Sequence, residues 1–427
     1  MFDRVPREPE ALSWTYATLW SGLIFVTVPF VRTGVDFVRG QWGSDVFTYA
    51  VAAMAVSATA VALFLTRRRW SLASCGCLLG LAAVVVYLTF GLAEGTPEEA
   101  VHYVQYGILS LLLYRAFSHR VSDYSIYAAA TVTGTFVGMI DETVQWITPG
   151  RQFGLRDIWL NFTAVALVQA GLAAGVRPKI IAGSPDWASL RRLCYLSAIA
   201  VGYLGLCHLN TPDRVAWYSA HVPLLGFIDA NRSIMVEYGY LHGDAATVHF
   251  RSRLTVKELR RSAIERAEEG SRILDRYRER DQYPTFLELY SPLTDPFLHE
   301  ARVHLFRRDV HLELAMNSEE GEARGRSFAT AHWENRILQD YFGELLRASS
   351  YDWPAALEAE VSAKADTAQP YDSWVSRYLI VAFSPQQLAF LFSAAVGALL
   401  LLGAYSGRRS SGQLGGQKQT ARQDLAR

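Results

Sequence analysis

Apolar runs of about twenty residues recur along the first half of the chain, and they restrict its fold more than any other feature. A helix rises about 1.5 Å per residue and the hydrocarbon core of a bilayer is about 30 Å thick, so one such run is long enough to cross a membrane. We expect transmembrane helices at roughly Ser13–Val31, Val46–Thr66, Ser71–Ala93, Glu98–Phe117, Ser125–Ile147, Asp157–Val176, Leu193–Leu209 and Pro385–Ala404.

Average composition conceals this pattern. The 427 residues have a net charge of zero and a mean hydropathy of only +0.10, because the segment from Thr211 to about Arg377 is charged and water-soluble. The sequence therefore predicts an all-α integral membrane protein with about eight transmembrane helices and a mainly helical soluble domain between the seventh and the eighth. A chain with no net charge gives no reason to expect a nucleic-acid partner. The partner that its apolar runs predict is the lipid bilayer.

Lysine and arginine in short loops predict the orientation of this membrane protein, since such residues collect on the cytoplasmic side. The basic loops after the second, fourth, sixth and eighth runs fall on one side, and the alternate loops, such as Arg32–Asp45, fall outside. In chain order, the sequence predicts a cytoplasmic N-terminus (1–12), a seven-helix membrane domain (13–209), an extracytoplasmic domain (210–384), an eighth transmembrane helix (385–404) and a disordered basic cytoplasmic tail (405–427).

The predicted extracytoplasmic domain reads as helices with one strand. Thr255 and Glu258 form a capping box before a helical pattern of apolar residues. The stretch Ala246–Leu254 alternates as a strand does. His299 and His304 are five residues apart, so they do not share a helix face as the histidines of a zinc-protease motif do; we interpret Glu300 and His304 as part of a solvated charged face.

Polar side chains gather in the outer part of three consecutive predicted spans. Acids, an imidazole, amides and a guanidinium are expected at one level of the membrane, where ionisable groups are costly unless they are paired or face a cavity. Such a set favours a functional site, although each residue alone has a structural explanation as a helix end or ion pair. The candidate ligand-binding residues are Glu98, His102, Gln105, Tyr106, Asp141, Glu142, Gln145, Arg151, Asp157 and Asn161.

Two strings in this region, EEAVHYVQYGILSLLLYRA and DETVQWITPGRQFGLRDIWLN, resemble the VanZ-like family of bacterial membrane proteins. The resemblance covers about residues 71–176. The family has a Glu-x-x-Gln at a helix end, then an Arg, then an Asp with an Asn four residues later, and an upstream His followed by a Tyr. The matching positions are Glu142, Gln145, Arg151, Asp157, Asn161, His102 and Tyr106.

Two departures from that family pattern are visible. Glu98 and Glu99 stand where the family often has a lysine, and Ala164 stands where it often has a glycine. The resemblance implies a role in the bacterial cell envelope, in the cytoplasmic membrane, linked to resistance to glycopeptides such as teicoplanin. The more acidic cluster of this chain weakens the case for an anionic ligand.

Three classes of function remain open. The first is a binding protein for a lipid-linked envelope precursor or a glycopeptide-like compound, with the outer domain docking a protein partner or the distal part of the ligand. The second is a membrane enzyme in which His102 works with Glu98, Asp141 or Glu142 as a general acid–base pair or a divalent-metal site. The third is an anchoring subunit of a membrane complex. The sequence favours the first, assigns no catalytic residue, and implies no metal or cofactor.

Overall fold

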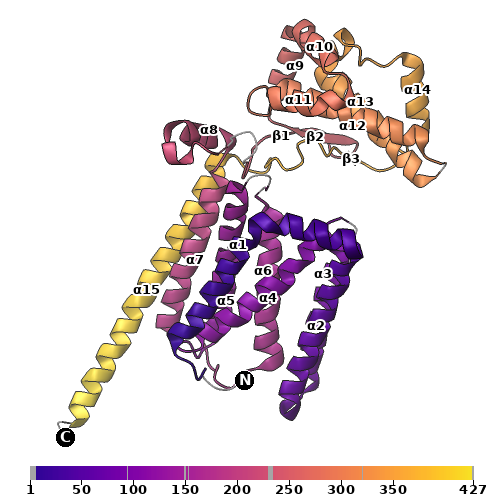
Figure 1. Ribbon diagram of the computed structural model, residues 1–427. Helices are drawn as coiled ribbons and strands as arrows, with labels where there is room; N and C mark the ends of the chain where they lie inside the picture. The colour runs from indigo at the N-terminus through magenta and orange to yellow at the C-terminus, as the bar shows by residue number, and fades with distance from the viewer. Residues whose placement is uncertain are drawn as a thin grey trace. The chain divides into compact units, whose positions relative to one another are not determined.

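The structure is a computed structural model that describes residues 6–93, 95–148, 151, 153–228, 234–319 and 321–425, with side chains up to residue 410. It divides into two compact units. The bundle unit comprises Met1–Cys207 and Ala389–Arg427, and the polar unit comprises His208–Leu388. Both units are mainly helical (Figure 1).

Long helices make up the bundle unit (Figure 1). They are α1 (Glu10–Trp42), α2 (Asp45–Thr66), α3 (Leu72–Ala93), α4 (Val101–Phe117), α5 (Ser125–Ile147), α6 (Leu155–Ala170), α7 (Trp187–His208) and α15 (Pro385–Leu425). Shorter turns join them: 3-10 turns η1 (Arg67–Arg69) and η2 (Pro97–Ala100), and a six-residue π-helix, η3 (Gly171–Val176), that continues α6.

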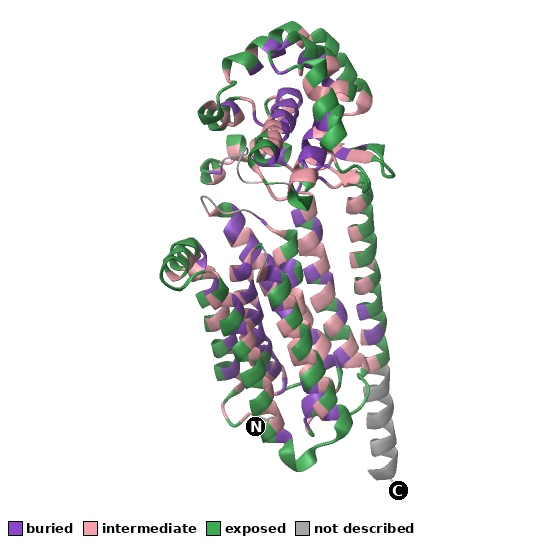
Figure 2. Ribbon diagram, turned by 90° about the vertical axis from the view of Figure 1, so that its right-hand side faces the viewer, coloured by how far each residue is buried: buried purple, intermediate pink, exposed green. Residues whose placement is uncertain are grey.

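Among the described residues, six helices are long and apolar enough to cross a membrane: Glu10–Trp42, Asp45–Arg69, Leu72–Ala93, Leu155–Val176, Trp187–His208 and Pro385–Ser410. Many of their apolar side chains face outward, and Figure 2 shows the exposed colour along the outer helices. Leu72 is 95% exposed and Leu401 is 75% exposed. Water would not tolerate so much contiguous apolar surface, so the chain is a multi-pass membrane protein.

Helices α4 and α5 fall outside that set of six, and they lie at the centre of the bundle. Both pack against α6 and α1 as well as against each other. Tyr106, Leu109 and Ser110 of α4 are fully buried, and the Ser110 hydroxyl donates to the Val165 carbonyl of α6 at 3.1 Å. A helix screened from lipid by its neighbours can carry small and polar residues, and these join helices inside a bilayer.

Ion pairs and hydrogen bonds fix which helix ends lie together in the bundle. Arg115, near the end of α4, is paired with Glu8, which precedes α1, and the Ser189 hydroxyl near the start of α7 donates to Asp123, which precedes α5, at 2.6 Å. At the other end of α1, Arg39 pairs with Glu98 of η2 at 2.9 Å. The start of α1 therefore lies beside the end of α4, and the starts of α5 and α7 lie together.

Several helix limits differ from the sequence prediction. α1 continues to Trp42 through most of the predicted Arg32–Asp45 loop, because an apolar stripe persists between its charged residues. α4 begins at Val101, since Pro97 starts a 3-10 turn instead. α15 continues to Leu425, beyond the predicted end of the eighth transmembrane helix at Ala404. Once a helix has formed, each further residue adds one hydrogen bond. Residues 1–5 and 426–427 lie outside the described residues.

The polar unit packs helices against a small sheet. Its helices are α8 (Pro212–His221), α9 (Val256–Glu265), α10 (Ala267–Arg276), α11 (Tyr283–Leu289), α12 (Pro296–Asn317), α13 (Glu322–Ala348) and α14 (Ala355–Lys364). The sheet has the order β1 (Tyr240–Asp244), β2 (Val248–Ser252), β3 (Tyr371–Asp372), with β1 antiparallel and β3 parallel to β2. The capping box of Thr255 and Glu258 is confirmed at the start of α9.

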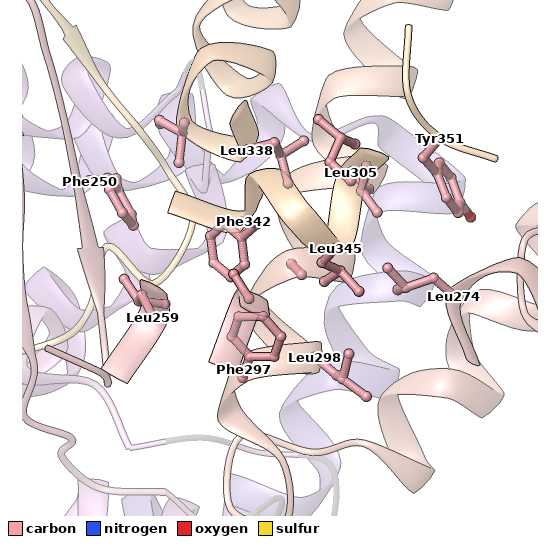
Figure 3. Packing of buried hydrophobic residues seen from close by; sticks show 14 of the residues in the cluster. Phe250, Leu259, Leu274, Phe297, Leu298, Leu305, Leu338, Phe342, Leu345 and Tyr351 are labelled. Atoms are coloured by element: carbon pink, nitrogen blue, oxygen red, sulfur yellow. The ribbon is translucent and has the colours of Figure 1, made fainter. Parts of the chain in front are cut away.

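Aromatic and aliphatic side chains from α9, α10, α12, α13 and β2 form the main core of the polar unit (Figure 3). Phe250, Phe297 and Phe342 lie at its centre, and each is at most 2% exposed. Burying a large apolar side chain contributes about 1.5–3 kcal/mol. This core therefore supplies most of the cohesion of the unit.

Buried charges sit beside that core, and here one sequence interpretation is wrong. Glu300 and His304 are fully buried rather than part of a solvated face. Glu300 accepts hydrogen bonds from the Ser252 hydroxyl at 2.5 Å and the Arg253 backbone at 2.8 Å. Arg253 also pairs with Glu237 at 2.7 Å. Ion-pair and hydrogen-bond partners from distant parts of the chain offset the cost of burying these charges. The spacing of residues along one helix cannot reveal such partners.

Candidate functional site

The predicted site residues lie where three helix ends meet in the bundle unit: the start of α4, the end of α5 and the start of α6. The Tyr106 hydroxyl donates to Asp141 Oδ2 at 3.1 Å, and the His102 ring stacks on Tyr106 with ring centroids 6.1 Å apart. Asp141, Glu99 and Asn161 are the electrostatic neighbours of His102. The structure therefore brings α4 and α5 residues of the predicted set into one cluster.

Glu142 holds the loop between α5 and α6. Its Oε1 accepts from Gln145 Nε2 at 2.8 Å, and its Oε2 accepts from the backbone N–H of Gly154 at 2.9 Å. Gln145 in turn accepts from Arg151 Nη2 at 2.5 Å. A buried carboxylate is stable only when donors surround it, so this chain of bonds orients Arg151 toward the cluster.

The start of α6 completes the cluster. Asn161 is fully buried, and its side chain packs against Gly138 of α5; a Cβ at Gly138 would come within 2.9 Å of the Asn161 Cβ. Asp157 lies beside Gly154, where an added Cβ would be 2.7 Å from the Asp157 carboxylate and 3.4 Å from that of Glu142. The carboxylates of Asp157 and Glu142 therefore both lie close to Gly154.

An ion pair of Arg156 and Glu99, neither of which was predicted as a site residue, lies at the exposed rim of this cluster. Arg156 pairs with Glu99 at 3.3 Å, and their side chains are 59% and 21% exposed. Asp157 is an electrostatic neighbour of Glu99. Polar groups therefore run from the surface at Arg156 to the buried amide of Asn161.

Several polar atoms in the buried part have no hydrogen-bond partner among the described residues. They are His102 Nδ1, Asp141 Oδ1, Arg151 Nε and both amide atoms of Asn161. The Asn161 side chain lies within hydrogen-bonding reach of His102, and that of Gln145 within reach of Asp141, but neither contact has the geometry of a normal hydrogen bond. Buried polar atoms are rarely left without a partner, because each costs about 1–3 kcal/mol. Their concentration in one place marks this cluster as a candidate binding site.

Two predicted residues are not part of the cluster. Glu98 lies in η2, before the first residue of α4, and pairs with Arg39 of α1. Gln105 contacts α1 through its backbone carbonyl, which accepts a hydrogen bond from Trp20 Nε1 at 2.9 Å.

The sequence analysis did not predict three participants in the cluster: Glu99, Arg156 and the Gly154 backbone. Glu99 and Arg156 adjoin predicted positions in the sequence, so the same acidic and basic pattern contains them. The role of Gly154 depends on the path of the loop, which no residue pattern specifies.

Charge and chemistry restrict what the cluster can bind. Four acids, Glu99, Asp141, Glu142 and Asp157, face two arginines, Arg151 and Arg156. Within the described part of the chain, no group of three His, Cys, Asp or Glu side chains has the geometry to hold a metal ion. The cluster offers hydrogen-bond donors and acceptors of both signs to a polar ligand.

Comparison with known proteins gives no relative from which a function could be transferred: no family model, no curated protein and no solved structure matches this chain.

Proposed function

We propose that this chain is a VanZ-like membrane protein of the bacterial cell envelope that binds the polar part of a lipid-linked precursor or a glycopeptide-like compound. The observation that carries the proposal is the set of buried polar atoms on His102, Asp141, Arg151 and Asn161 that make no hydrogen bond of normal geometry with the described residues. A ligand that supplies the missing partners recovers the free energy that these groups lose on burial. The ordered motif from Glu142 to Asn161 supports the family assignment.

The proposed topology has eight transmembrane helices, with α4 and α5 crossing at the centre of the bundle. Arg67, Arg68 and Arg69 after α2 share one end with Arg115 and Arg120 after α4, which supports a cytoplasmic location for that end. Both chain termini would then be cytoplasmic. The cluster would lie near the outer leaflet, and residues 210–384 would be extracytoplasmic.

The geometry supports recognition in two layers. At the rim, Arg156 and Glu99 are accessible to a headgroup that arrives along the outer leaflet. Deeper in the cluster, Arg151 Nε is available to donate to a phosphate or carboxylate, and Asp141 Oδ1 to accept from an amine or hydroxyl. A ligand that carries both kinds of group, such as an amino-sugar or peptide attached to a phosphate, fits this set better than a simple anion.

An enzyme acting on an outer-leaflet lipid-linked substrate is the second candidate. His102 and Asp141 are electrostatic neighbours inside the cluster, which is the pairing used in general acid–base catalysis. Turnover of a polyprenyl-linked precursor by purified protein, lost in His102→Ala, would establish this activity.

The binding proposal is tested with Arg151→Ala and Glu142→Gln in full-length protein. Expressed in a teicoplanin-sensitive host, the wild type should reduce susceptibility and both variants should restore it. Purified wild type should bind a polyprenyl-diphosphate-linked peptidoglycan precursor at least about tenfold more tightly than either variant. The matched control is Arg39→Ala, which removes an exposed arginine outside the cluster. Equal susceptibility and equal precursor binding in all four proteins would exclude the proposal.

A further inference from the structure

A second region of the bundle unit has the shape of a binding site. A cavity of about 1340 Å³ lies between the α2–α3 hairpin on one side and α4, α6 and η3 on the other. Pockets for drug-sized ligands have volumes of about 300–1,000 Å³. This cavity is therefore large enough for a long amphiphile.

The helix arrangement explains why the cavity remains open. The α2–α3 hairpin contacts the rest of the bundle through η2 near one end and η3 near the other, and only sparsely in between. Small side chains widen the middle, among them Ala58 of α2, Ala82 of α3 and Gly107 of α4. The π-helix η3 adds Gly171, Leu172 and Val176 to the wall. Such π-helical turns are rare and occur frequently at functional sites.

The walls are almost entirely apolar, but one end is charged. Arg7, Glu8, Arg115 and Ser118 line that end. Glu8 accepts from Arg115 Nη2 at 2.7 Å and from the Ser13 hydroxyl at 2.8 Å, which fixes Arg115 in place. Two arginines against one carboxylate leave one net positive charge at the mouth of an apolar cavity.

This cavity is separate from the polar cluster. It is lined by the face of α4 that carries Val104, Gly107 and Leu111, whereas His102 and Tyr106 point to α5 and α6. Its charged end lies at the end of α4 where Arg115 is located, opposite the start of α4 where the cluster lies.

We propose that the cavity binds an anionic membrane lipid, with its hydrocarbon chains between α3 and α4 and its phosphate at Arg115 and Arg7. Hydrocarbon chains suit these walls because they carry no hydrogen-bonding groups, whereas a peptide would leave its backbone unsatisfied there. The net positive end selects an anionic headgroup over a zwitterionic one. Leaflet orientation follows from the topology proposed above, but the binding itself does not depend on it.

The test uses purified full-length protein reconstituted with equal amounts of phosphatidylglycerol and phosphatidylcholine, then washed in detergent. The wild type should retain phosphatidylglycerol about tenfold over phosphatidylcholine. Ala82→Trp fills the cavity and should lose the retained lipid, whereas the neighbouring Ala83→Trp, outside the cavity lining, should keep it. Arg7→Gln should retain lipid with a reduced preference for the anionic one.

Ala58→Trp with Ala60→Trp as its control replaces the first pair if Ala82→Trp does not fold. Retention of both lipids in equal amounts by the wild type would overturn the proposal, as would unchanged retention in a folded cavity-filling variant. Neither result would bear on ligand binding at the cluster, since the cluster residues are intact in every protein compared.

Discussion

Glu334 is a buried carboxylate that is surrounded by hydrogen-bond donors. Its carboxylate is fully buried and accepts from His304 Nδ1 at 2.5 Å, the Tyr371 hydroxyl at 2.7 Å and the Ser373 hydroxyl at 2.8 Å. Arg307 Nε lies 3.1 Å away. Burial alone would raise the pKa of Glu334, but His304 and the donated hydrogen bonds hold it below its usual value. This residue joins α12, α13 and β3, and its role is structural.

Glu334→Gln should destabilise the polar unit by about 3 kcal/mol, because the amide cannot accept from all of these donors and leaves buried groups unpaired. Hydrogen–deuterium exchange of α13 in the full-length protein should accelerate about a hundredfold. The control is Glu344→Gln on the same helix, an exposed pair with Arg347 whose loss should cost less than about 1 kcal/mol. Equal exchange rates in the two variants would contradict this assignment.

His299 predicts how the stability of the polar unit depends on pH. Burial lowers the pKa of His299 to about 4 from its ordinary value of 6.5. Between these values the unfolded chain binds a proton that the folded chain does not, so stability falls as pH falls from 6.5 to 4, by up to about 3 kcal/mol. The protection factors of α12 amides, which are exchange rates corrected for the intrinsic pH dependence of amide exchange, should fall in the wild type as pH falls across this range. His299→Asn should remove most of that fall, and an unchanged pH profile in this variant would contradict the prediction.

At the scale of helices and strands, the apolar runs predict most of the bundle, because a membrane requires each spanning segment to satisfy its own backbone. The sequence is less informative where contacts with other elements determine the local structure. Glu98 leaves the helix because Pro97 starts a tighter turn. β1 was not predicted, because its hairpin depends on a pairing with β2 that residue patterns within Tyr240–Asp244 do not reveal.

Dependence on neighbouring elements also explains why only part of the site was predictable from the sequence. His102, Tyr106, Asp141 and Asn161 were predictable because hydropathy places polar residues at matching depths of successive helices. Whether polar atoms of His102, Asp141 and Asn161 lack partners among the described residues depends on side-chain geometry across three helices, which no spacing rule gives.

Close packing between α7 and α15 yields a prediction at this scale. A Cβ at Gly205 would come within 2.9 Å of the Phe392 Cβ, whereas at Gly202 the nearest atom, on Val396, would be 3.7 Å away. Gly205→Ala should therefore force the helices apart and cost about 1–3 kcal/mol, and Gly202→Ala should be tolerated. Thermal unfolding of the two variants in the same detergent checks this, and equal midpoints would contradict the observed packing.

For the whole molecule, the proposed topology makes a separate prediction. In a background with Cys75, Cys77, Cys194 and Cys207 replaced by serine, a cysteine introduced by Lys257→Cys in α9 should react with a membrane-impermeant maleimide in intact cells. Arg68→Cys in η1 should react only after lysis. Both positions are exposed, so access across the membrane decides the result. The reverse labelling pattern would place the polar unit in the cytoplasm and remove the outer-leaflet role.

The central claim is that the polar cluster of the bundle is built for a ligand, and Asn161→Leu tests it most directly. Both amide atoms of Asn161 are buried and make no hydrogen bond of normal geometry with the described residues, although the side chain lies close to His102. A similarly sized apolar side chain should therefore leave the stability of the folded protein unchanged or raise it by about 1–3 kcal/mol. The same change should weaken binding of a polyprenyl-diphosphate-linked precursor at least about tenfold. The measurement is the affinity and the unfolding midpoint of wild type and Asn161→Leu, side by side. A more stable protein with weaker binding is the result we predict; a less stable protein with unchanged affinity would show that Asn161 serves the fold and would contradict the claim.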